Sequence, residues 1–177
     1  MIITTGGAGF IGSNLVAALE ARGKRVAVSD WLGTGDKWRN IAKRDVEAII
    51  APENLDVFLD DHAREIEAVF HMGAISTTTE TDVDKIVENN IRLSQKLYLW
   101  CAQKNVPLIY ASSAATYGDR SGGFKDDETI EGLTKLQPLN PYGWSKHLFD
   151  RWVAQQKKTS RKQPPQCVGL KFFNVYG

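Results

Sequence analysis

The chain has 177 residues, of which 42% are hydrophobic, enough to bury the core of one globular domain. Its 22 Lys and Arg residues nearly balance its 21 Asp and Glu residues, so no overall field favours nucleic acid or an anionic membrane as a partner. Two cysteines, Cys101 and Cys167, are too few for a disulfide framework. No apolar run is long enough to span a bilayer and no basic leader precedes the first one, which predicts a cytoplasmic protein.

Strand and helix patterns alternate along the chain. In chain order they predict a strand at 1–5, a helix at 10–23, strands at 24–30 and 46–50, a helix at 55–65, a strand at 66–74, a helix at 82–103, a strand at 106–114, a helix at 140–156 and a strand at 166–177. The strands are apolar throughout, which is typical of a parallel sheet covered on both faces. The sequence therefore predicts an α/β fold, a Rossmann-type doubly wound parallel sheet formed by a single domain, 1–177.

Glycines crowd the turn between the first strand and the first helix. Gly6, Gly9 and Gly12 have the spacing G-x-x-G-x-x-G. Such glycines permit a tight turn, a close approach of the backbone to a pyrophosphate, and close packing of the helix on the strand. The pyrophosphate then meets the free N–H groups at the N-terminus of the helix. Glycines alone are also found in turns without ligands, but an acid, Asp30, ends the second strand, and the combination predicts dinucleotide binding.

The same acid bears on which dinucleotide is bound. Asp30 is placed to accept hydrogen bonds from the adenosine ribose, which favours NAD because a 2′-phosphate there would meet a like charge. Lys37 and Arg39 follow in the next loop and could neutralise such a phosphate, or could simply form a solvated face. The sequence leaves the choice between NAD and NADP open.

A second group of residues carries chemistry. Tyr142 and Lys146 lie four residues apart at the start of a predicted helix, so their side chains share one face. A free phenol, with a pKa of about 10, is a poor base at neutral pH, and we expect the Lys146 ammonium to favour the phenolate. Ser113 ends the fifth strand at the edge where such sheets bind ligands. Together these three side chains predict proton transfer coupled to hydride transfer.

Several segments carry a resemblance to a known family. They are TGGAGFIG (5–12), Ser113, YGWSK (142–146) and FNVYG (173–177). Over essentially its whole length the chain resembles the extended short-chain dehydrogenase/reductase superfamily. Within it, the segments HMGAISTTTETD, YASSAATYGD and NPYGWSKHLFD most resemble the ADP-L-glycero-D-manno-heptose 6-epimerases of lipopolysaccharide core synthesis. The resemblance implies an NAD(P)-dependent isomerase that inverts C6 of an ADP-heptose, a nucleotide sugar, by transient hydride transfer to a bound cofactor.

The resemblance also implies a role for individual residues. Tyr142 becomes the catalytic acid/base, Ser113 its hydrogen-bonding partner and Lys146 the residue that orients the cofactor. Further cofactor contacts fall on the glycine turn, after the second and fourth strands, in the long helix and near the end of the chain, at Gly6, Gly9, Phe10, Ile11, Gly12, Asp30, Trp31, Lys37, Met72, Gly73, Ala74, Ile75, Ser76, Asn89 and Val175. Ser113 and Asn174 would contact the sugar nucleotide. Without the family, Asn89 could equally be a capping or solvent-facing amide.

One position separates epimerases from dehydratases of the superfamily. Dehydratases carry an Asp-Glu pair directly after the catalytic Ser or Thr, because removing water needs an added acid and base. Ala114 and Ala115 stand there in this chain, so we expect epimerisation. In the family a second base, a Lys, is thought to lie downstream of the FNVYG segment. We therefore expect a truncated chain that binds dinucleotide but epimerises poorly or not at all, and a homo-oligomer in the full-length protein.

Alternatives remain at this stage. A UDP-hexose 4-epimerase, or another NAD-dependent epimerase of the superfamily, would carry the same catalytic set. A non-catalytic dinucleotide-binding module would need the glycine turn but not a phenol paired with an ammonium. No metal site is expected, since the three histidines, His62, His71 and His147, lack metal-ligand spacing.

Overall fold

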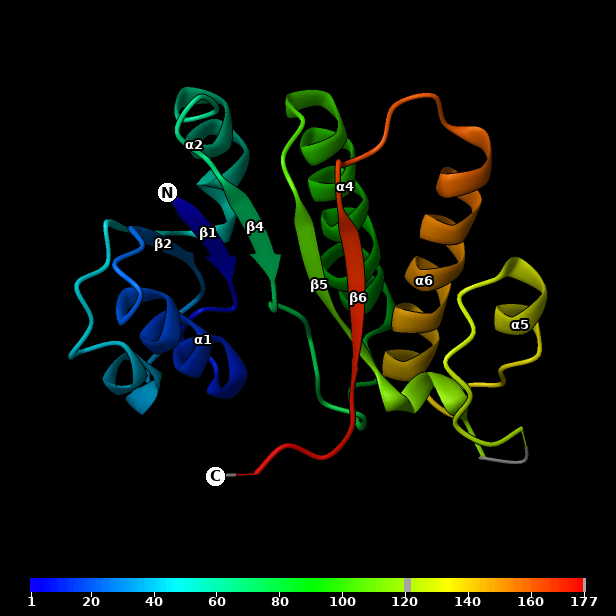
Figure 1. Ribbon diagram of the computed structural model, residues 1–177. Helices are drawn as coiled ribbons and strands as arrows, with labels where there is room; N and C mark the ends of the chain where they lie inside the picture. The colour runs from blue at the N-terminus through cyan, green and yellow to red at the C-terminus, as the bar shows by residue number, and fades with distance from the viewer. Residues whose placement is uncertain (120–121, 177) are drawn as a thin grey trace.

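Six parallel strands form one sheet in the computed structural model, which describes residues 1–119 and 122–176. Their order is β3-β2-β1-β4-β5-β6, so the direction in which strands are added reverses between β1 and β4 (Figure 1). The strands are β1 (Ile2–Thr5), β2 (Val26–Ser29), β3 (Ala48–Ile50), β4 (Ala68–His71), β5 (Leu108–Ser113) and β6 (Cys167–Phe172). The predicted doubly wound parallel sheet is confirmed. Gly177, the last residue of the FNVYG segment, lies outside the described residues.

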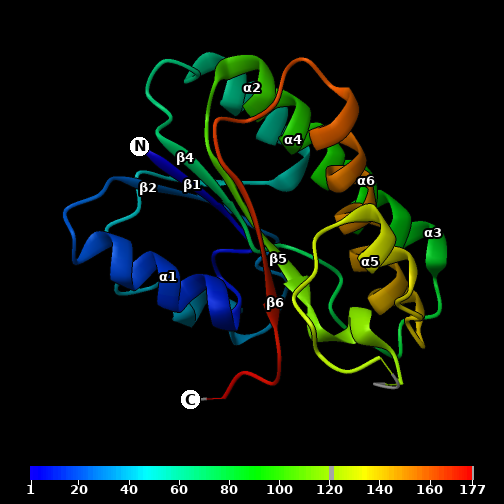
Figure 2. The same ribbon diagram turned by 45° about the vertical axis from the view of Figure 1, so that its right-hand side comes forward.

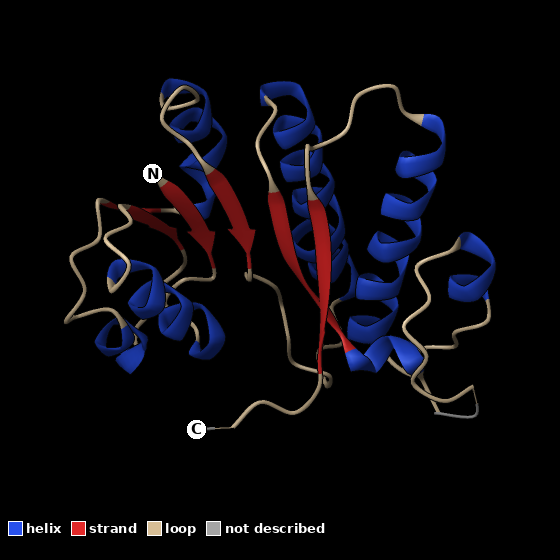
Figure 3. Cartoon of the chain, viewed as in Figure 1, coloured by secondary structure: helices blue, strands red, loops and turns tan. Residues whose placement is uncertain are grey.

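Helices connect the strands, as Figure 3 shows by colour. The longer ones are α1 (Phe10–Glu20), α2 (Leu55–Asp61), α4 (Leu93–Lys104) and α6 (Pro141–Thr159), and the short ones are α3 (Val83–Ile86) and α5 (Ile130–Thr134). Single helical turns add η1 (Asp36–Asn40), η2 (Pro52–Asn54) and η4 (Ala114–Tyr117). The turns and α5 were not predicted, because each is too short to show a repeating apolar pattern. No helix within the described ranges is both long and apolar enough to cross a membrane.

The two faces of the sheet are covered unequally (Figure 2). On one face α1 packs Val16 and Leu19 against β1 and β2. On the other face a larger core joins α2, α4 and α6, with Leu59, Leu97 and Phe149 among its buried side chains. No residue of β6 is fully buried, so the edge of the sheet at this strand is only partly covered.

The predicted helix 82–103 is interrupted, which corrects the sequence interpretation. A π-helical segment, η3 (Val87–Arg92), separates α3 from α4. The wider turn brings Asn90 inward, where its side chain is completely buried. Its Oδ1 accepts a hydrogen bond of 2.8 Å from the N–H of Ile75, and its Nδ2 donates to the carbonyl of Ile75 and to the hydroxyl of Ser145, both at 3.0 Å. Asn90 therefore ties the loop after β4 to α6.

Helix α6 begins where the sequence predicts. The side chain of Asn140 caps it by accepting a hydrogen bond of 2.8 Å from the N–H of Gly143, and Pro141 occupies the first helical position, which needs no donor. Because the cap fixes the start of the helix, it also fixes which face carries Tyr142 and Lys146.

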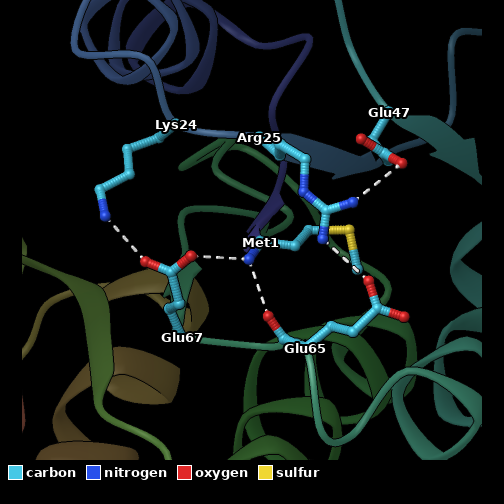
Figure 4. A network of polar contacts seen from close by, with 6 residues as sticks. All are labelled: Met1, Lys24, Arg25, Glu47, Glu65 and Glu67. Carbon is cyan, nitrogen blue, oxygen red and sulfur yellow. Dashed lines mark hydrogen bonds and ion pairs between the residues drawn. The ribbon is translucent and has the colours of Figure 1, made fainter.

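Polar contacts join the N-terminal ends of β1, β2 and β4 (Figure 4). The amino group of Met1 donates to the carbonyl of Glu65 at 2.7 Å and to the carboxylate of Glu67 at 2.9 Å. Lys24 donates to the same carboxylate at 2.8 Å. These hydrogen bonds, with Lys24 contributing most, lower the pKa of Glu67 to about 2. These contacts join the starts of β1, β2 and β4.

Candidate active site

One cavity of about 1220 Å³ opens at the C-terminal ends of the strands. In Figure 1 these ends lie at the bottom of the sheet, and the chain that follows β6 runs along the same side. All of the site residues predicted from the sequence line this cavity: Gly6, Gly9, Phe10, Ile11, Gly12, Asp30, Trp31, Lys37, Met72, Gly73, Ala74, Ile75, Ser76, Asn89, Ser113, Tyr142, Lys146, Asn174 and Val175. The structure thus brings together residues that are far apart in the sequence.

The glycine turn leaves no room for larger residues. Gly6 has a φ of +65°, and a Cβ placed on it would lie 2.6 Å from the Cα of Gly73. A Cβ on Gly12 would meet the carbonyl of Gly6. Helix α1 starts directly after Gly9, and none of the described side chains caps its first turn. Its free N–H groups face the cavity together with the positive end of the helix dipole, an arrangement that suits a pyrophosphate.

Asp30 joins the end of β2 to the glycine turn. One carboxylate oxygen accepts a hydrogen bond of 2.9 Å from the N–H of Ala8, and the other accepts one from the ammonium group of Lys37. The side chain of Asn40 donates to the carbonyl of Ala8 at 2.8 Å, so it braces the same turn from η1. Each carboxylate oxygen has a second lone pair, so Asp30 can still accept a bond from a ribose hydroxyl. Lys37 stands beside it as a cation.

The two asparagines of η3 have different positions. Asn89 lines the cavity, and its amide donates to the carbonyl of Lys85 one turn earlier at 2.8 Å. Asn90 faces the interior and holds the loop that carries Ala74 to Ser76. Sequence reasoning named the first asparagine and missed the second. The signal that could have found Asn90 is a polar residue in the buried stripe of a helix, since such groups are retained only when hydrogen-bonded.

Ser113 and Tyr142 meet at one end of the cavity. The hydroxyl of Ser113 caps η4 by accepting a hydrogen bond of 3.1 Å from the N–H of Ala115. Burial raises the pKa of Tyr142, and a hydrogen bond with Ser113 partly opposes this. The direction contradicts our expectation that Lys146 would favour the phenolate. The physical reason is that burial in this half of the cavity disfavours any charge on the phenol oxygen.

Lys146 is buried without a partner. Only 4% of the residue is exposed, and within the described part of the chain no hydrogen bond or ion pair reaches its ammonium group. Burial lowers its pKa to about 8, although the charge of Asp150 acts in the opposite direction. A buried ammonium group that faces a cavity without a direct hydrogen bond favours a polar ligand, because a buried charge that is not hydrogen-bonded is costly. With the glycine turn, this unpaired ammonium fits the polar groups of a dinucleotide.

Aromatic rings line the remaining wall. Phe124 and Phe173 meet edge to face with their ring centres 5.2 Å apart, and Tyr117 contacts both rings. Asn174 and Val175 follow at the rim and are exposed. The sequence did not predict that Phe124 would belong to this wall, since it lies in a stretch without a repeating pattern.

The arrangement of glycine turn, acid and Ser-Tyr-Lys set can be compared with known proteins. A model of the NAD dependent epimerase/dehydratase family matches residues 2–177. The chain belongs to this family. The family description names NAD, in agreement with the predicted nicotinamide dinucleotide.

Relatives of this family member share its sequence closely. Over 180 residues it is 51% identical to an ADP-L-glycero-D-manno-heptose-6-epimerase of Fusobacterium nucleatum and 45% identical to one of Nitratidesulfovibrio vulgaris. The alignments cover 100% of this chain but 53% and 54% of those proteins. The chain therefore spans about half the length of the curated relatives it matches.

Solved structures of the family have the same fold. The ADP-L-glycero-D-manno-heptose-6-epimerase of Helicobacter pylori matches with a TM-score of 0.80 at 28% identity, over 99% of this chain and 56% of that one. The UDP-glucose 4-epimerase of Thermus thermophilus, solved in complex with NAD, matches with a TM-score of 0.78 at 31% identity, over 99% and 56%. Both matches extend across the sheet and the cavity of this epimerase/dehydratase family member.

Proposed function

We propose that the intact protein is an ADP-L-glycero-D-manno-heptose 6-epimerase of lipopolysaccharide core synthesis, an isomerase that inverts C6 of its nucleotide-sugar substrate. The observation that carries this proposal is the convergence of Ser113, Tyr142 and Lys146 on the cavity that also contains the glycine turn. The choice of sugar is supported by the two curated relatives that bear this name at 51% and 45% identity.

In this proposal the chain's own residues bind the cofactor and move a proton. When bound, a nicotinamide dinucleotide would supply the acceptor for a hydride, and inversion requires that the hydride return to the opposite face of the same carbon. The glycine turn and the start of α1 would hold the pyrophosphate, Asp30 the adenosine ribose and Lys146 the nicotinamide ribose. Tyr142 takes the proton of the sugar hydroxyl, or gives a proton to the ketone oxygen, on one face of the sugar, while Ser113 donates a hydrogen bond to the same sugar oxygen. The second base expected downstream of the FNVYG segment would serve the opposite face.

The pKa of Tyr142 fits one half of this cycle directly. Since burial raises that pKa, the phenol is neutral at pH 7 and ready to donate its proton to a ketone. The other half needs the phenolate, so we expect removal of the substrate proton to accelerate as the pH rises.

The lining of the cavity supports epimerisation over elimination. Ala114 and Ala115 occupy the positions where a dehydratase carries its acid and base, and both line the cavity. Among the described residues that line it, Asp30 is the one carboxylate, and it is bound to the glycine turn by Ala8. A second acid for the removal of water is therefore not supplied by this part of the protein.

The experiment that tests the proposal offers the intact protein ADP-D-glycero-D-manno-heptose and UDP-galactose side by side. Mass spectrometry of the purified protein first establishes whether a nicotinamide cofactor is retained. Product analysis by NMR should show inversion at C6 of the heptose, and in D₂O no deuterium at C6, because the hydride returns from the cofactor. Turnover of UDP-galactose alone would favour the UDP-hexose 4-epimerase, which the Thermus thermophilus match also supports.

A pair of matched variants connects that activity to the site. We expect Tyr142→Phe to lower kcat by about 10²- to 10⁴-fold, the usual contribution of a positioned acid/base, with cofactor still bound. Lys158→Met is the control, since Lys158 is exposed on the last turn of α6 and does not line the cavity, so its loss should leave the rate unchanged. Full activity of Tyr142→Phe would contradict the assigned role.

Location, assembly and domain extent belong to the same proposal. We place the enzyme in the cytoplasm as a homo-oligomer without nucleic-acid or membrane partners, with residues 1–177 forming its NAD(P)-binding domain. Exposed apolar side chains on neighbouring helices, Val57 on α2 and Leu99 on α4, support association with a second copy. Sedimentation of the intact protein tests this, and a monomer at all concentrations would contradict it.

A further inference from the structure

Asp150 continues the catalytic face of α6. It lies one helical turn beyond Lys146, which in turn lies one turn beyond Tyr142, so the three side chains follow one stripe of the helix. Asp150 is 7% exposed although it is charged, and the sequence analysis gave it no role. A carboxylate in a buried stripe is costly unless it is fully paired, so its partners indicate why it is there.

Those partners come from two strands of the sheet. One oxygen of Asp150 accepts a hydrogen bond of 2.9 Å from the hydroxyl of Tyr110 on β5. The other accepts bonds of 2.7 Å from the hydroxyl of Ser112 and 2.8 Å from the ammonium group of Lys171 on β6. The carboxylate therefore joins α6 to the two strands beside it.

The same contacts continue to the catalytic serine. Ser112 is the residue directly before Ser113, so the Asp150 bond fixes the end of β5. The ammonium of Lys171 also donates to the hydroxyl of Thr116 at 2.8 Å, and that hydroxyl donates to the carbonyl of Ser113 at 2.8 Å. The position of Ser113 relative to the helix that carries Tyr142 is thus set on both sides by groups bound to Asp150.

Asp150 also supplies the negative charge near Lys146. Asp150, one turn along α6, and the neutral imidazole of His71 on β4 are close enough to Lys146 to interact with it electrostatically. Tyr142 and Ser113 line the same cavity as Lys146, and Lys171 on β6 is bound to Asp150. Within this described set, Asp150 is the acid. Burial lowers the pKa of Lys146 and Asp150 raises it, whereas no other group in the set is negative at pH 7.

We propose that Asp150 is a positioning residue that fixes α6 against the ends of β5 and β6 and provides the counter-charge for Lys146. Its role in turnover rests on the proposed function, but its effect on Lys146 does not. The proposed function and the effect of Asp150 on Lys146 can therefore be disproved independently.

The decisive experiment measures the titration of Lys146 in the intact, cofactor-free protein. The rate at which acetic anhydride labels this lysine is followed against pH by mass spectrometry, with Lys146→Ala identifying the labelled peptide. Asp150→Asn keeps the shape of the side chain and removes its charge. We expect the neutral fraction of Lys146 at pH 7 to rise about threefold to tenfold, as expected when an opposite charge that is shared with another cation is lost.

Two further variants separate charge from packing. Tyr110→Phe removes one neutral hydrogen bond to Asp150 but keeps the carboxylate, so the labelling profile of Lys146 should not move. Asp150→Asn leaves Lys171 as a partly buried cation without its ion pair, which can destabilise the fold. The double variant Asp150→Asn, Lys171→Met removes both charges, and we expect the same direction of change in Lys146. An unaltered Lys146 profile in this folded double variant would overturn the proposal.

Turnover gives a second readout. If the protein is the proposed epimerase, Asp150→Asn should lower kcat and shift the pH profile while leaving KM for the nucleotide sugar unchanged. Inactive wild-type protein together with a shifted Lys146 titration would reject the proposed function and keep this inference. If the enzyme is active but Asp150→Asn changes neither its pH profile nor the titration of Lys146, the proposed function would stand and this inference would be rejected.

Discussion

The hydroxyl of Thr5, at the end of β1, and Nδ1 of His71, at the end of the neighbouring β4, share a hydrogen bond of 2.7 Å in the interior. The other ring nitrogen lies 2.8 Å from the hydroxyl of Ser94, which itself donates to the carbonyl of Asn90. Since that hydroxyl proton is already used, the ring must donate from Nε2 and accept at Nδ1 from Thr5. Thr5 then accepts from the N–H of Gly73 at 3.1 Å, so the neutral imidazole helps to join the end of β1 to the loop after β4.

This buried histidine predicts sensitivity to acid. Burial, with a smaller effect of Lys146, lowers the pKa of His71 to about 3 from 6.5. Because the unfolded state takes up the proton first, this contribution to stability is complete above pH 6.5 and is lost as the pH falls towards 3, by roughly 5 kcal/mol in all. Urea unfolding of the wild type and His71→Asn between pH 3 and 7 checks this. The variant should have the flatter profile, and His62→Asn, a partly exposed control, should keep the wild-type slope.

Replacing Lys146 is predicted to stabilise the folded protein. Its pKa of about 8 lies below the ordinary value of 10.5, so the charged lysine destabilises the folded, cofactor-free protein. We expect Lys146→Met to raise the free energy of unfolding by roughly 3 kcal/mol below pH 8, and this gain to vanish as the pH rises to 10.5. Denaturant unfolding at pH 7 and pH 10 measures it. Exposed Lys158→Met serves as the control, and a destabilised Lys146→Met at pH 7 would contradict the argument.

The glycine turn can be tested with two alanines. Gly12→Ala would place a methyl group on the carbonyl of Gly6, whereas Gly35→Ala meets no atom within 4 Å. We expect Gly12→Ala to lose retained cofactor and to destabilise the fold by ~1–3 kcal/mol, as overpacking usually does. Gly35→Ala should behave as the wild type in cofactor content and melting temperature. Wild-type cofactor binding by Gly12→Ala would show that the turn does not approach the dinucleotide.

Lys37 bears on the choice between NAD and NADP. Its ammonium lies on the carboxylate of Asp30, where it would meet a 2′-phosphate. We expect Lys37→Ala to weaken NADP by about tenfold, equivalent to ~1.4 kcal/mol, while NAD changes little. Arg39→Ala is the control, because Arg39 is exposed and bound to Asp36 at 2.9 Å. Titration of each cofactor by fluorescence measures the ratio, and an equal loss of both cofactors would contradict a role in selectivity.

Tyr142 was assigned a role from the sequence, whereas Asp150 was not, and the difference lies in how local their interactions are. The glycine pattern and the spacing of Tyr142 and Lys146 reflect local backbone geometry. The strands, the main helices and the residues that line the cavity could therefore be predicted from the sequence. The pKa of Tyr142 depends on burial by distant segments, and the expected direction was wrong. Asp150 is joined to partners about 40 residues earlier in the chain, a relationship without local signature. Packing between segments that are distant in the sequence determines the pKa of Tyr142 and the partners of Asp150, which the local motifs do not predict.

The π-helical segment η3 has a consequence for engineering. Each residue advances a helix by about 100°, so the extra residue in this wider turn sets how α3 is rotated about the axis of α4. Deleting a single residue between 87 and 92 would turn the π-helical segment into ordinary α-helix and move Asn89 or Asn90 away from its partners. A one-residue gap in this stretch would therefore exchange Asn89, which lines the cavity, for Asn90, which is bonded in the interior. A graft of this helix between relatives should preserve its length.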